Sequence, residues 1–368
     1  LSKEYPELFN DTLNNGSRNQ HLSPSASGGF SVTYISVGTL FRKSNLNEVS
    51  STFKQFETNR AIISRRVAEG NPYWVNAGRP TTTDGYAQGY NRYAQDVLVP
   101  AFLAAYTGKD ANGVSLVNQS NKSIKSNPFS GVIPKPNWQM TYTGLSKIPA
   151  LAKKFSAITL THGYNGNLSM NSFTSALNYI DPFRFGAPGF IDTVSGNYIP
   201  FYLLPNITLR ESFSPLLGID VTTNNQLNVK FEYKKSRQLS LSLIDYQLSE
   251  TNSTEWVIGA GFRIKGLVLP FSLPGMKGAK KLQNDISFRL DLSSRDDATS
   301  NSRLDQENAY GTGGQKVITI QPSIDYVLNN RLNIKLFFDQ RRVTPYISSA
   351  APTINTRAGL QIRVSLAP

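Results

Sequence analysis

Few side chains in this 368-residue chain are able to do acid–base or metal chemistry. It has two histidines, His21 and His162, and no cysteine, so a general base or metal site would have to recruit one of those imidazoles. The missing thiols also remove disulfides, thiolate nucleophiles and most zinc frameworks. His162 lies in the stretch ITLTHGYNG, whose alternating apolar residues favour an interfacial histidine over a catalyst. We therefore expect no enzyme: no catalytic residue, no cofactor and no metal.

Two other stretches resemble ligand sites only superficially. YGTGGQKV at 310–317 lacks the GxxxxGK[ST] spacing of a phosphate loop, and we interpret it as a glycine-rich loop that leads into a strand. Asp296 and Asp297, with Asp305 and Glu307, lack the alternate-residue ligand spacing of a calcium loop. We expect these carboxylates to lie solvated in a polar loop.

The charge balance is basic, with 38 Lys and Arg against 25 Asp and Glu. No basic run exceeds two residues, so a phosphate-gripping patch and nucleic-acid binding are not expected, whereas contact with anionic lipid head groups stays open. The densest apolar stretch, VLVPAFLAAY at 97–106, is too short for a membrane helix. The opening LSKEYPELFN shows no signal peptide, and we expect a fragment or a mature form.

Strict alternation of apolar and polar residues dominates the last ~150 residues and predicts strands whose two faces meet different solvents. At 357–366 and 331–339, alternate residues are apolar while their neighbours are mostly polar. At 284–292 the polar set includes three charges, which a soluble core would not accept. Alternation through 226–250 is unusually long, and its shift in parity after Leu243 predicts a bulge.

About ten strands follow from this pattern. They are expected near 30–41, 137–145, 156–169, 199–222, 226–249, 254–265, 282–293, 315–328, 331–342 and 356–366.

The connections alternate in length. Tight turns are predicted at 223–225 and 328–331, and long polar loops at 294–314 and 343–355, as in barrels with short periplasmic turns and long outer loops. This assignment puts the C-terminus on the periplasmic side. The stretch 170–200 is predicted as a further outer loop, either folded over a pore or simply on the surface.

The resulting fold class is an all-β membrane protein: an antiparallel transmembrane β-barrel segment, about ten strands of a larger barrel, with a partly helical insertion. Residues 1–29 are a periplasmic-side lead-in, 30–41 the first strand, 42–135 the insertion on the extracellular side and 136–368 the barrel strands. In the insertion, Asn45 and Glu48 form a predicted capping box before a helix, and a second helix is expected at 90–107. The apolar stripe of the insertion is expected to pack on the insertion itself.

Parity then assigns side chains to the two faces. The predicted pore-lining residues are Lys230, Glu232, Lys234, Arg263, Lys265, Arg289, Asp291, Lys335, Arg357 and Arg363. The predicted lipid-facing residues are Leu332, Ile334, Leu336, Phe338, Leu360, Ile362 and Val364. Aromatics expected at the membrane interfaces are Trp256, Phe262, Phe288, Tyr326, Phe338 and Tyr346.

Several long stretches of the sequence also resemble a known protein family. The stretches that carry this resemblance include LNVKFEYKKSRQLSLSLIDYQLSE, STEWVIGAGFR, LPFSLPG and GQKVITIQPSIDYVLNNRLNIKLFFDQRRVTPY. They resemble the C-terminal portion of the SprA/Sov family, the giant outer-membrane translocon barrels of Bacteroidota type IX secretion. The similarity continues through YAQDVLVPAFLAAY, NPFSGVIPKPNW, ITLTHGYNGNLSMNSF and FSPLLGIDVT.

The resemblance implies a protein-conducting channel in the bacterial outer membrane that exports folded cargo, including gliding-motility adhesins. It implies as partners the rest of the translocon barrel chain, secreted cargo proteins with a C-terminal signal, a carrier barrel of the PorV type, a periplasmic plug protein and outer-membrane lipids. The residues leave three rivals open: a self-contained porin or nutrient receptor barrel, a soluble β-rich binding protein, and an outer-membrane hydrolase that uses His162.

Overall fold

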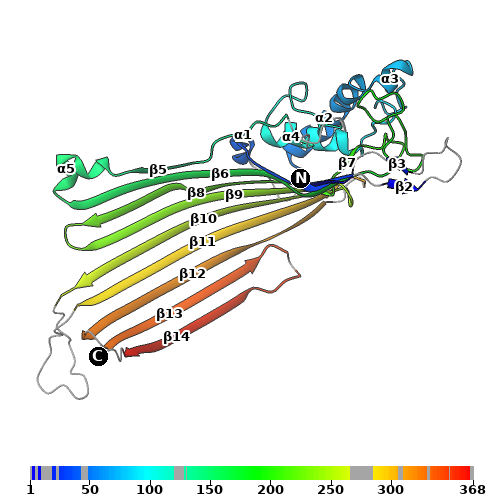
Figure 1. Ribbon diagram of the computed structural model, residues 1–368. Coiled ribbons are helices and arrows are strands. Elements are labelled where there is room, and N and C mark those ends of the chain that lie inside the picture. The colour runs from blue at the N-terminus through cyan, green and yellow to red at the C-terminus, as the bar shows by residue number, and fades with distance from the viewer. Residues whose placement is uncertain are drawn as a thin grey trace, which may run out of the picture.

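The computed structural model describes residues 2–4, 7–9, 19–21, 25–42, 49–119, 128–129, 131–265, 285–305, 310–329, 332–347 and 349–364. Most of them belong to one antiparallel sheet, in the order β1-β4-β6-β8-β9-β10-β11-β12-β13-β14, with β5 and β7 also paired to β6. Figure 1 shows these long strands as one inclined sheet with helices over one end. The all-β prediction is therefore confirmed at this level.

The sheet strands and a separate β2–β3 hairpin have the following bounds. They are β1 Ser2–Glu4, β2 Glu7–Phe9, β3 Asn19–His21, β4 Ser25–Thr33, β5 Trp138–Tyr142, β6 Phe155–Ser175, β7 Tyr202–Leu203, β8 Asn206–Thr223, β9 Leu227–Ser242, β10 Gln247–Ile264, β11 Ile286–Arg303, β12 Tyr310–Asn329, β13 Leu332–Pro345 and β14 Thr353–Val364.

The strands run farther than the apolar alternation predicted. The loop expected at 294–314 is mostly strand, because β11 continues to Arg303 and β12 begins at Tyr310. The glycine-rich loop expected at 310–317 is likewise part of β12. Gly314 has a φ of 141°, and a Cβ there would lie 2.1 Å from the carbonyl oxygen of Asp297, so the close pairing of β11 and β12 requires glycine at this position.

The predicted strand 226–249 is wrong in one respect. It is two strands, because β9 ends at Ser242, a turn occupies 243–246, and β10 begins at Gln247. Tyr246 adopts a left-handed φ of 49° in that turn. Leu241 pairs with Leu248 across the turn, so the change in parity after Leu243 marks a chain reversal rather than a bulge.

One strand of the sheet is split by the helical insertion. β4 pairs with β6 as far as Thr33 opposite Asn167, and β5 resumes along the same strand with Trp138 opposite Tyr164. The backbone N–H of Lys135 donates to the carbonyl of Thr33 at 2.9 Å, which joins the two halves. The insertion therefore leaves from the middle of a strand, and not from a connection between two complete strands.

This splitting corrects the N-terminal assignments. The strand predicted at 30–41 is β4, which covers Ser25–Thr33, and α1 (Val37–Leu40) follows it. Ser27 lies opposite Thr174, at the end of the sheet that carries the 176–205 connection. β1 (Ser2–Glu4) pairs with Ser25–Ser27 and so lies at this same end, opposite the 224–226 turn. The assignment of 1–29 as a periplasmic-side lead-in stays a prediction.

The helices of the insertion form a compact layer. They are α2 (Ser51–Glu69), α3 (Pro72–Asn76) and α4 (Gln95–Thr107), while a 3₁₀ turn η1 (Gly144–Lys147) and α5 (Pro149–Ala152) lie between β5 and β6. The Ser50 side chain caps α2 by accepting from the N–H of Phe53 at 3.1 Å. The capping box predicted at Asn45 and Glu48 lies outside the described residues.

The insertion packs on the sheet as well as on itself, contrary to the expectation of self-packing. Phe56, Ile63 and Phe102 from the helices share one buried core with Leu168, Leu209, Leu239 and Leu241 from β6, β8 and β9. α4 is buried on all sides, because it packs against α2 and lies in the core that the helices share with the sheet. Among the described residues, none of the helices has the length and hydrophobicity needed to cross a membrane.

Candidate functional site

The candidate site is the charged face of the sheet. Directly opposed residues of an antiparallel pair point to the same side, so the register assigns every strand side chain to a face. One such row runs through Arg263, Ser287, Asp325, Lys335 and Gln361 from β10 to β14. Nine of the ten predicted pore-lining residues lie in strands on this face, and Lys265 follows the end of β10, exposed.

Neighbouring charges of opposite sign balance much of this face. Glu232 accepts from Lys230 at 2.8 Å and from Lys234 at 3.1 Å, all three on β9. Arg289 pairs with Asp291 at 2.7 Å, and Arg357 pairs with Asp339 on β13. The cationic side chains of these pairs are all a third or more exposed, so each pair contributes little stability, but together they keep the face hydrated.

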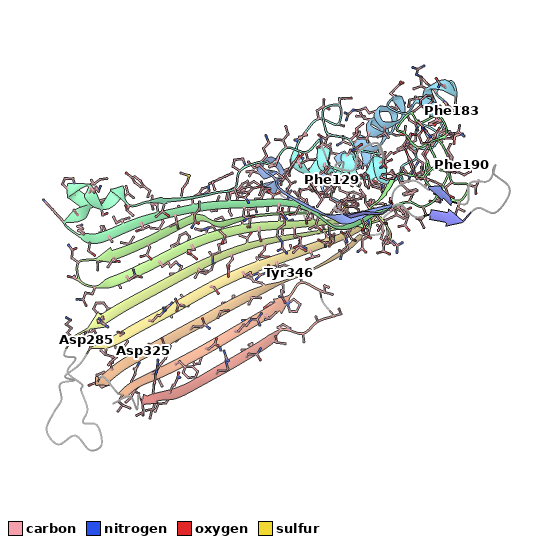
Figure 2. All side chains as sticks on the ribbon, in the orientation of Figure 1. Phe129, Phe183, Phe190, Asp285, Asp325 and Tyr346 are labelled. Carbon is pink, nitrogen blue, oxygen red and sulfur yellow. The ribbon has the colours of Figure 1, made fainter. Side chains whose placement is uncertain are left out.

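Glycines hollow this face near one end. Gly259 and Gly261 on β10 present no side chain between the charged residues of β9 and β11, and a shallow depression of about 380 Å³ lies over them. Asp325 on β12 lines its edge, close to the end of the sheet where Asp285 and Asp325 are labelled in Figure 2.

The opposite face is apolar. The row Leu227, Phe262, Phe288, Ile324, Leu336 and Leu360 crosses six strands without a polar side chain. All seven predicted lipid-facing residues lie on this face of β13 and β14, among them Leu336, Leu360 and Ile362, which are 51%, 62% and 57% exposed. No described part of the chain covers this large apolar surface.

The uncovered apolar surface is a band with a defined border. On β10 it extends from Trp256 to Ile264, and Trp256 lies opposite Tyr233 of β9. The next row on the same face is polar, with Lys235, Thr254, Asp296, Lys316 and Thr344 from five successive strands. Of the predicted interface aromatics, Trp256 lies at this border, and Tyr346 lies beyond it, donating to Asp296 at 2.5 Å.

Beyond that border the apolar character depends on the insertion. Where the helices lie over the sheet, the face carries Leu209, Leu239 and Leu241, which are fully buried. In β11 the same two rows contain Ser300 and Ser302, so the apolar residues of these rows do not continue into β11. The polarity of the side chains along each strand thus matches its surroundings. They are apolar under the helices, polar where they meet water, and apolar again along the band, which no described part of the chain covers.

A buried ion pair fixes the insertion to the sheet. Glu211 of β8 and Arg237 of β9 lie opposite each other, with Arg237 Nη2 2.7 Å from Glu211 Oε2 and both side chains at most 3% exposed. Arg237 also donates to Thr39 Oγ1 at 2.7 Å and to the carbonyl oxygen of Tyr106 at 3.3 Å. The Ser36 hydroxyl donates to Glu211. These bonds join β8 and β9 to the segment around α1 and to the end of α4.

The other sequence candidates that the structure describes lie far apart in the sheet, on β6 and β11. His162 Nδ1 lies 2.7 Å from the carbonyl oxygen of Leu216, and its ring lies beside Phe213 and Trp138, so it is half-buried within the sheet, between β5 and β8. Asp296 and Asp297 lie in β11 on opposite faces rather than in a loop, and Asp297 pairs with Arg295 at 2.8 Å. Among the described residues, no cluster of His, Asp and Glu is arranged to hold a metal.

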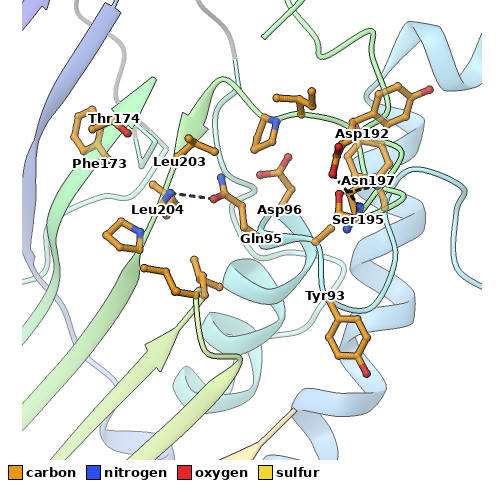
Figure 3. A pocket seen from close by; sticks show the side chains of 18 of the residues that line it. Tyr93, Gln95, Asp96, Phe173, Thr174, Asp192, Ser195, Asn197, Leu203 and Leu204 are labelled. Carbon is orange, nitrogen blue, oxygen red and sulfur yellow. Dashed lines mark hydrogen bonds between the residues drawn. The ribbon is translucent and has the colours of Figure 1, made fainter. Parts of the chain in front are cut away.

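Sequence reasoning missed a cavity of about 600 Å³ between the insertion and the sheet. The N-terminus of α4, the end of β6, the 192–205 segment and the 243–246 turn surround it, as Figure 3 shows. Of the outer loop predicted at 170–200, residues 170–175 belong to β6, and the connection 176–205 packs against the insertion here, where the N–H of Asn91 donates to Asn197 Oδ1 at 2.9 Å. Because the cavity is formed by four segments that are distant in the sequence, no local sequence pattern predicts it.

Asp96 is the buried acid of this cavity. Gln119 Nε2 donates to Asp96 Oδ1 at 2.5 Å, and Gln119 Oε1 accepts from the N–H of Tyr202 at 3.2 Å. Gln95 Oε1 accepts from the N–H of Leu204 at 3.0 Å, the bond drawn in Figure 3. Burial raises the pKa of the Asp96 carboxyl to about 7, against a smaller lowering by the two glutamines.

No known family model matches the chain, and a search of curated proteins found no match.

The buried pair yields a stability prediction. Arg237→Met leaves the Glu211 carboxylate buried without its cation, and we expect the free energy of unfolding to fall by about 3–5 kcal/mol, with most of the loss recovered in the double variant Glu211→Leu/Arg237→Met. Heat unfolding of the full chain in detergent measures this. Arg79→Met breaks the exposed pair with Glu69 and should cost less than about 1 kcal/mol. A double variant no more stable than the single one contradicts the assignment.

Asp96 predicts a pH dependence. The Asp96 carboxyl binds a proton more tightly in the folded chain than in the unfolded one. This proton binding contributes fully to the stability of the fold below about pH 4, and the contribution, on the order of 4 kcal/mol, is lost as pH rises through about 7. Asp96→Asn stays neutral and should remove this loss. We expect the melting temperature of Asp96→Asn to exceed that of the wild type increasingly between about pH 4 and pH 7, and by a constant amount above that. A difference that does not grow between those two pH values is the contrary result.

Proposed function

We propose that this sheet is a wall segment of an outer-membrane β-barrel that conducts folded proteins, as the C-terminal part of a type IX secretion translocon. The observation that carries the proposal is the uncovered apolar band opposite a charged face. Such two-sidedness is expected where every second side chain meets lipid and its neighbours meet water in a channel.

The width of the band supports a membrane. Along β10 it covers Trp256 to Ile264, and nine residues at ~3.3 Å each, tilted by ~40°, span roughly 23 Å, close to the ~25 Å apolar band of outer-membrane barrels. Tyr233 and Trp256 stand at the border, where aromatic side chains are favoured at membrane interfaces. The rival of a soluble β-rich protein would leave this band in water.

The open edge of the sheet favours a segment of a larger barrel over a self-contained porin or nutrient receptor. Among the described residues β14 pairs only with β13, and it is the last strand of the sheet. An unpaired strand edge in hydrocarbon costs several kcal/mol for each unsatisfied backbone group, so β14 requires a neighbour there. We propose that the rest of the translocon barrel chain supplies it.

The mechanism proposed is passive. A hydrated wall whose charges are already paired, such as Lys230 with Glu232 and Arg289 with Asp291, offers passing protein few apolar contacts. The driving force, the carrier barrel of the PorV type that receives the cargo and the periplasmic plug are other components in this proposal. The resemblance of the sequence to the SprA/Sov family supports the choice of folded cargo with a C-terminal signal.

Site-specific photocrosslinking during export tests this function. Lys335 and Leu336 are neighbours on β13 that point to opposite faces. In cells with the complete secretion machinery, we expect a photoreactive residue at 335 to crosslink to secreted cargo and one at 336 to crosslink at most a tenth as much. Both variants must export cargo at the wild-type rate. Cargo adducts of equal yield at the two positions, or none at 335 during active export, would exclude the channel.

A further inference from the structure

The cavity beside α4 has a composition unlike the rest of the molecule. The chain carries a formal net charge of +13, yet the residues that line this cavity include two carboxylates, Asp96 and Asp192, and neither lysine, arginine nor histidine. Four tyrosines, Tyr90, Tyr93, Tyr198 and Tyr246, line it as well. Its volume of about 600 Å³ lies within the roughly 300–1,000 Å³ typical of small-ligand sites.

The polar groups of the cavity leave one charge without a counterion. Asp96 is 4% exposed and is held by the neutral amides of Gln95 and Gln119. A buried carboxylate without a cation is unfavourable, and it is relieved either by a proton or by a positively charged ligand. Asp192, across the cavity in Figure 3, is oriented by the backbone N–H of Ser195 at 2.9 Å.

The walls suit both parts of an organic cation, its charged group and its apolar stem. The rings of Tyr93 and Tyr246 lie 5.3 Å apart at the side formed by the turn, and aromatic faces attract organic cations. Leu203, Leu243 and Ile244 add apolar surface beside them. Phosphate, carboxylate and other anionic ligands would meet two acids and no cation here, so the electrostatics exclude them.

We propose that this cavity binds an organic cation on an aliphatic stem, the chemistry of a lysine or arginine side chain. Asp96 and Asp192 supply the countercharge, the tyrosines contact the cationic group and the apolar side chains contact the stem. The cavity is lined by the insertion and the outer part of the sheet, away from the charged face, so this site is independent of the conduction proposed above.

Calorimetry on the full chain in a nonionic detergent tests the site, with N-acetyl-lysine amide, N-acetyl-norleucine amide and butylammonium as probes. We expect the lysine probe to bind at least tenfold more tightly than its norleucine isostere. If butylammonium equals the lysine probe, the site takes free amines; if it is several-fold weaker, the site takes a peptide-borne side chain. No heat from either cation up to 10 mM, or equal binding of lysine and norleucine probes, overturns the proposal.

Variants locate the binding. Asp96→Asn keeps an oxygen for Gln119 but removes the charge, and Ile244→Trp fills the mouth from a side chain that is 71% exposed. Both should weaken the lysine probe at least tenfold. Asp110→Asn, an exposed acid of the same insertion, and Ile133→Trp, at a side chain 72% exposed and outside the cavity, should leave it within twofold. Unchanged binding in both Asp96→Asn and Ile244→Trp overturns the assignment, and equal melting of Ile244→Trp and wild type excludes unfolding.

Binding should also strengthen between pH 5.5 and pH 8.5. Asp96 loses its proton in this range, whereas the pKa of Asp192 is held below its usual value by its bonds to Ser195, and those of Tyr90 and Tyr198 are raised above theirs by burial. Tyr93 and Tyr246 are the remaining titratable groups in the lining. Affinity for the lysine probe that does not change across this range, or falls, contradicts a role for Asp96.

Discussion

Pairing of backbone groups along continuous strands is the constraint on which this structure depends. Once every strand is hydrogen-bonded to its neighbour, alternate side chains must face opposite sides, and each side can meet a different surrounding. From β8 to β14 the register keeps apolar side chains such as Phe231, Ile258 and Leu292 on one side and charged ones such as Glu232, Asp291 and Lys335 on the other. The candidate function follows from that separation rather than from any reactive group.

The helical insertion is part of the same logic. It leaves from the gap between β4 and β5, lies over the apolar side of β6, β8 and β9, and is tied there by Arg237 and Glu211. Helices and strands therefore share one core at that end of the sheet (Figure 1). The exposed aromatics Phe183 and Phe190 lie on the connection that packs against this layer, far from the band (Figure 2). The insertion and the band divide the apolar side between them.

Sequence reasoning succeeded where the signal was local. The alternation around Leu336 and Leu360 requires only neighbouring residues, and it predicted which side chains share a face. It failed where strands extend beyond the apolar band and no helix covers them. There both faces of the strand are polar, as at Asp296 and Ser300, so the sequence has no apolar alternation and resembles a loop. It failed again where contacts are distant: β4 and β5 are parts of one strand about a hundred residues apart, and the cavity beside Asp96 is formed by segments from four places in the sequence.

Depth- and solvent-resolved spin labelling of β13 tests the two-sidedness most directly. The chain has no cysteine, so single cysteines at positions 332–339 can each carry one nitroxide without background. In membranes that contain the protein, this account predicts that collision with oxygen peaks at the even positions and collision with a water-soluble nickel chelate at the odd ones, with a period of two. Equal access of the nickel chelate to both sets, or its exclusion from both, would contradict a wall with lipid on one side and water on the other.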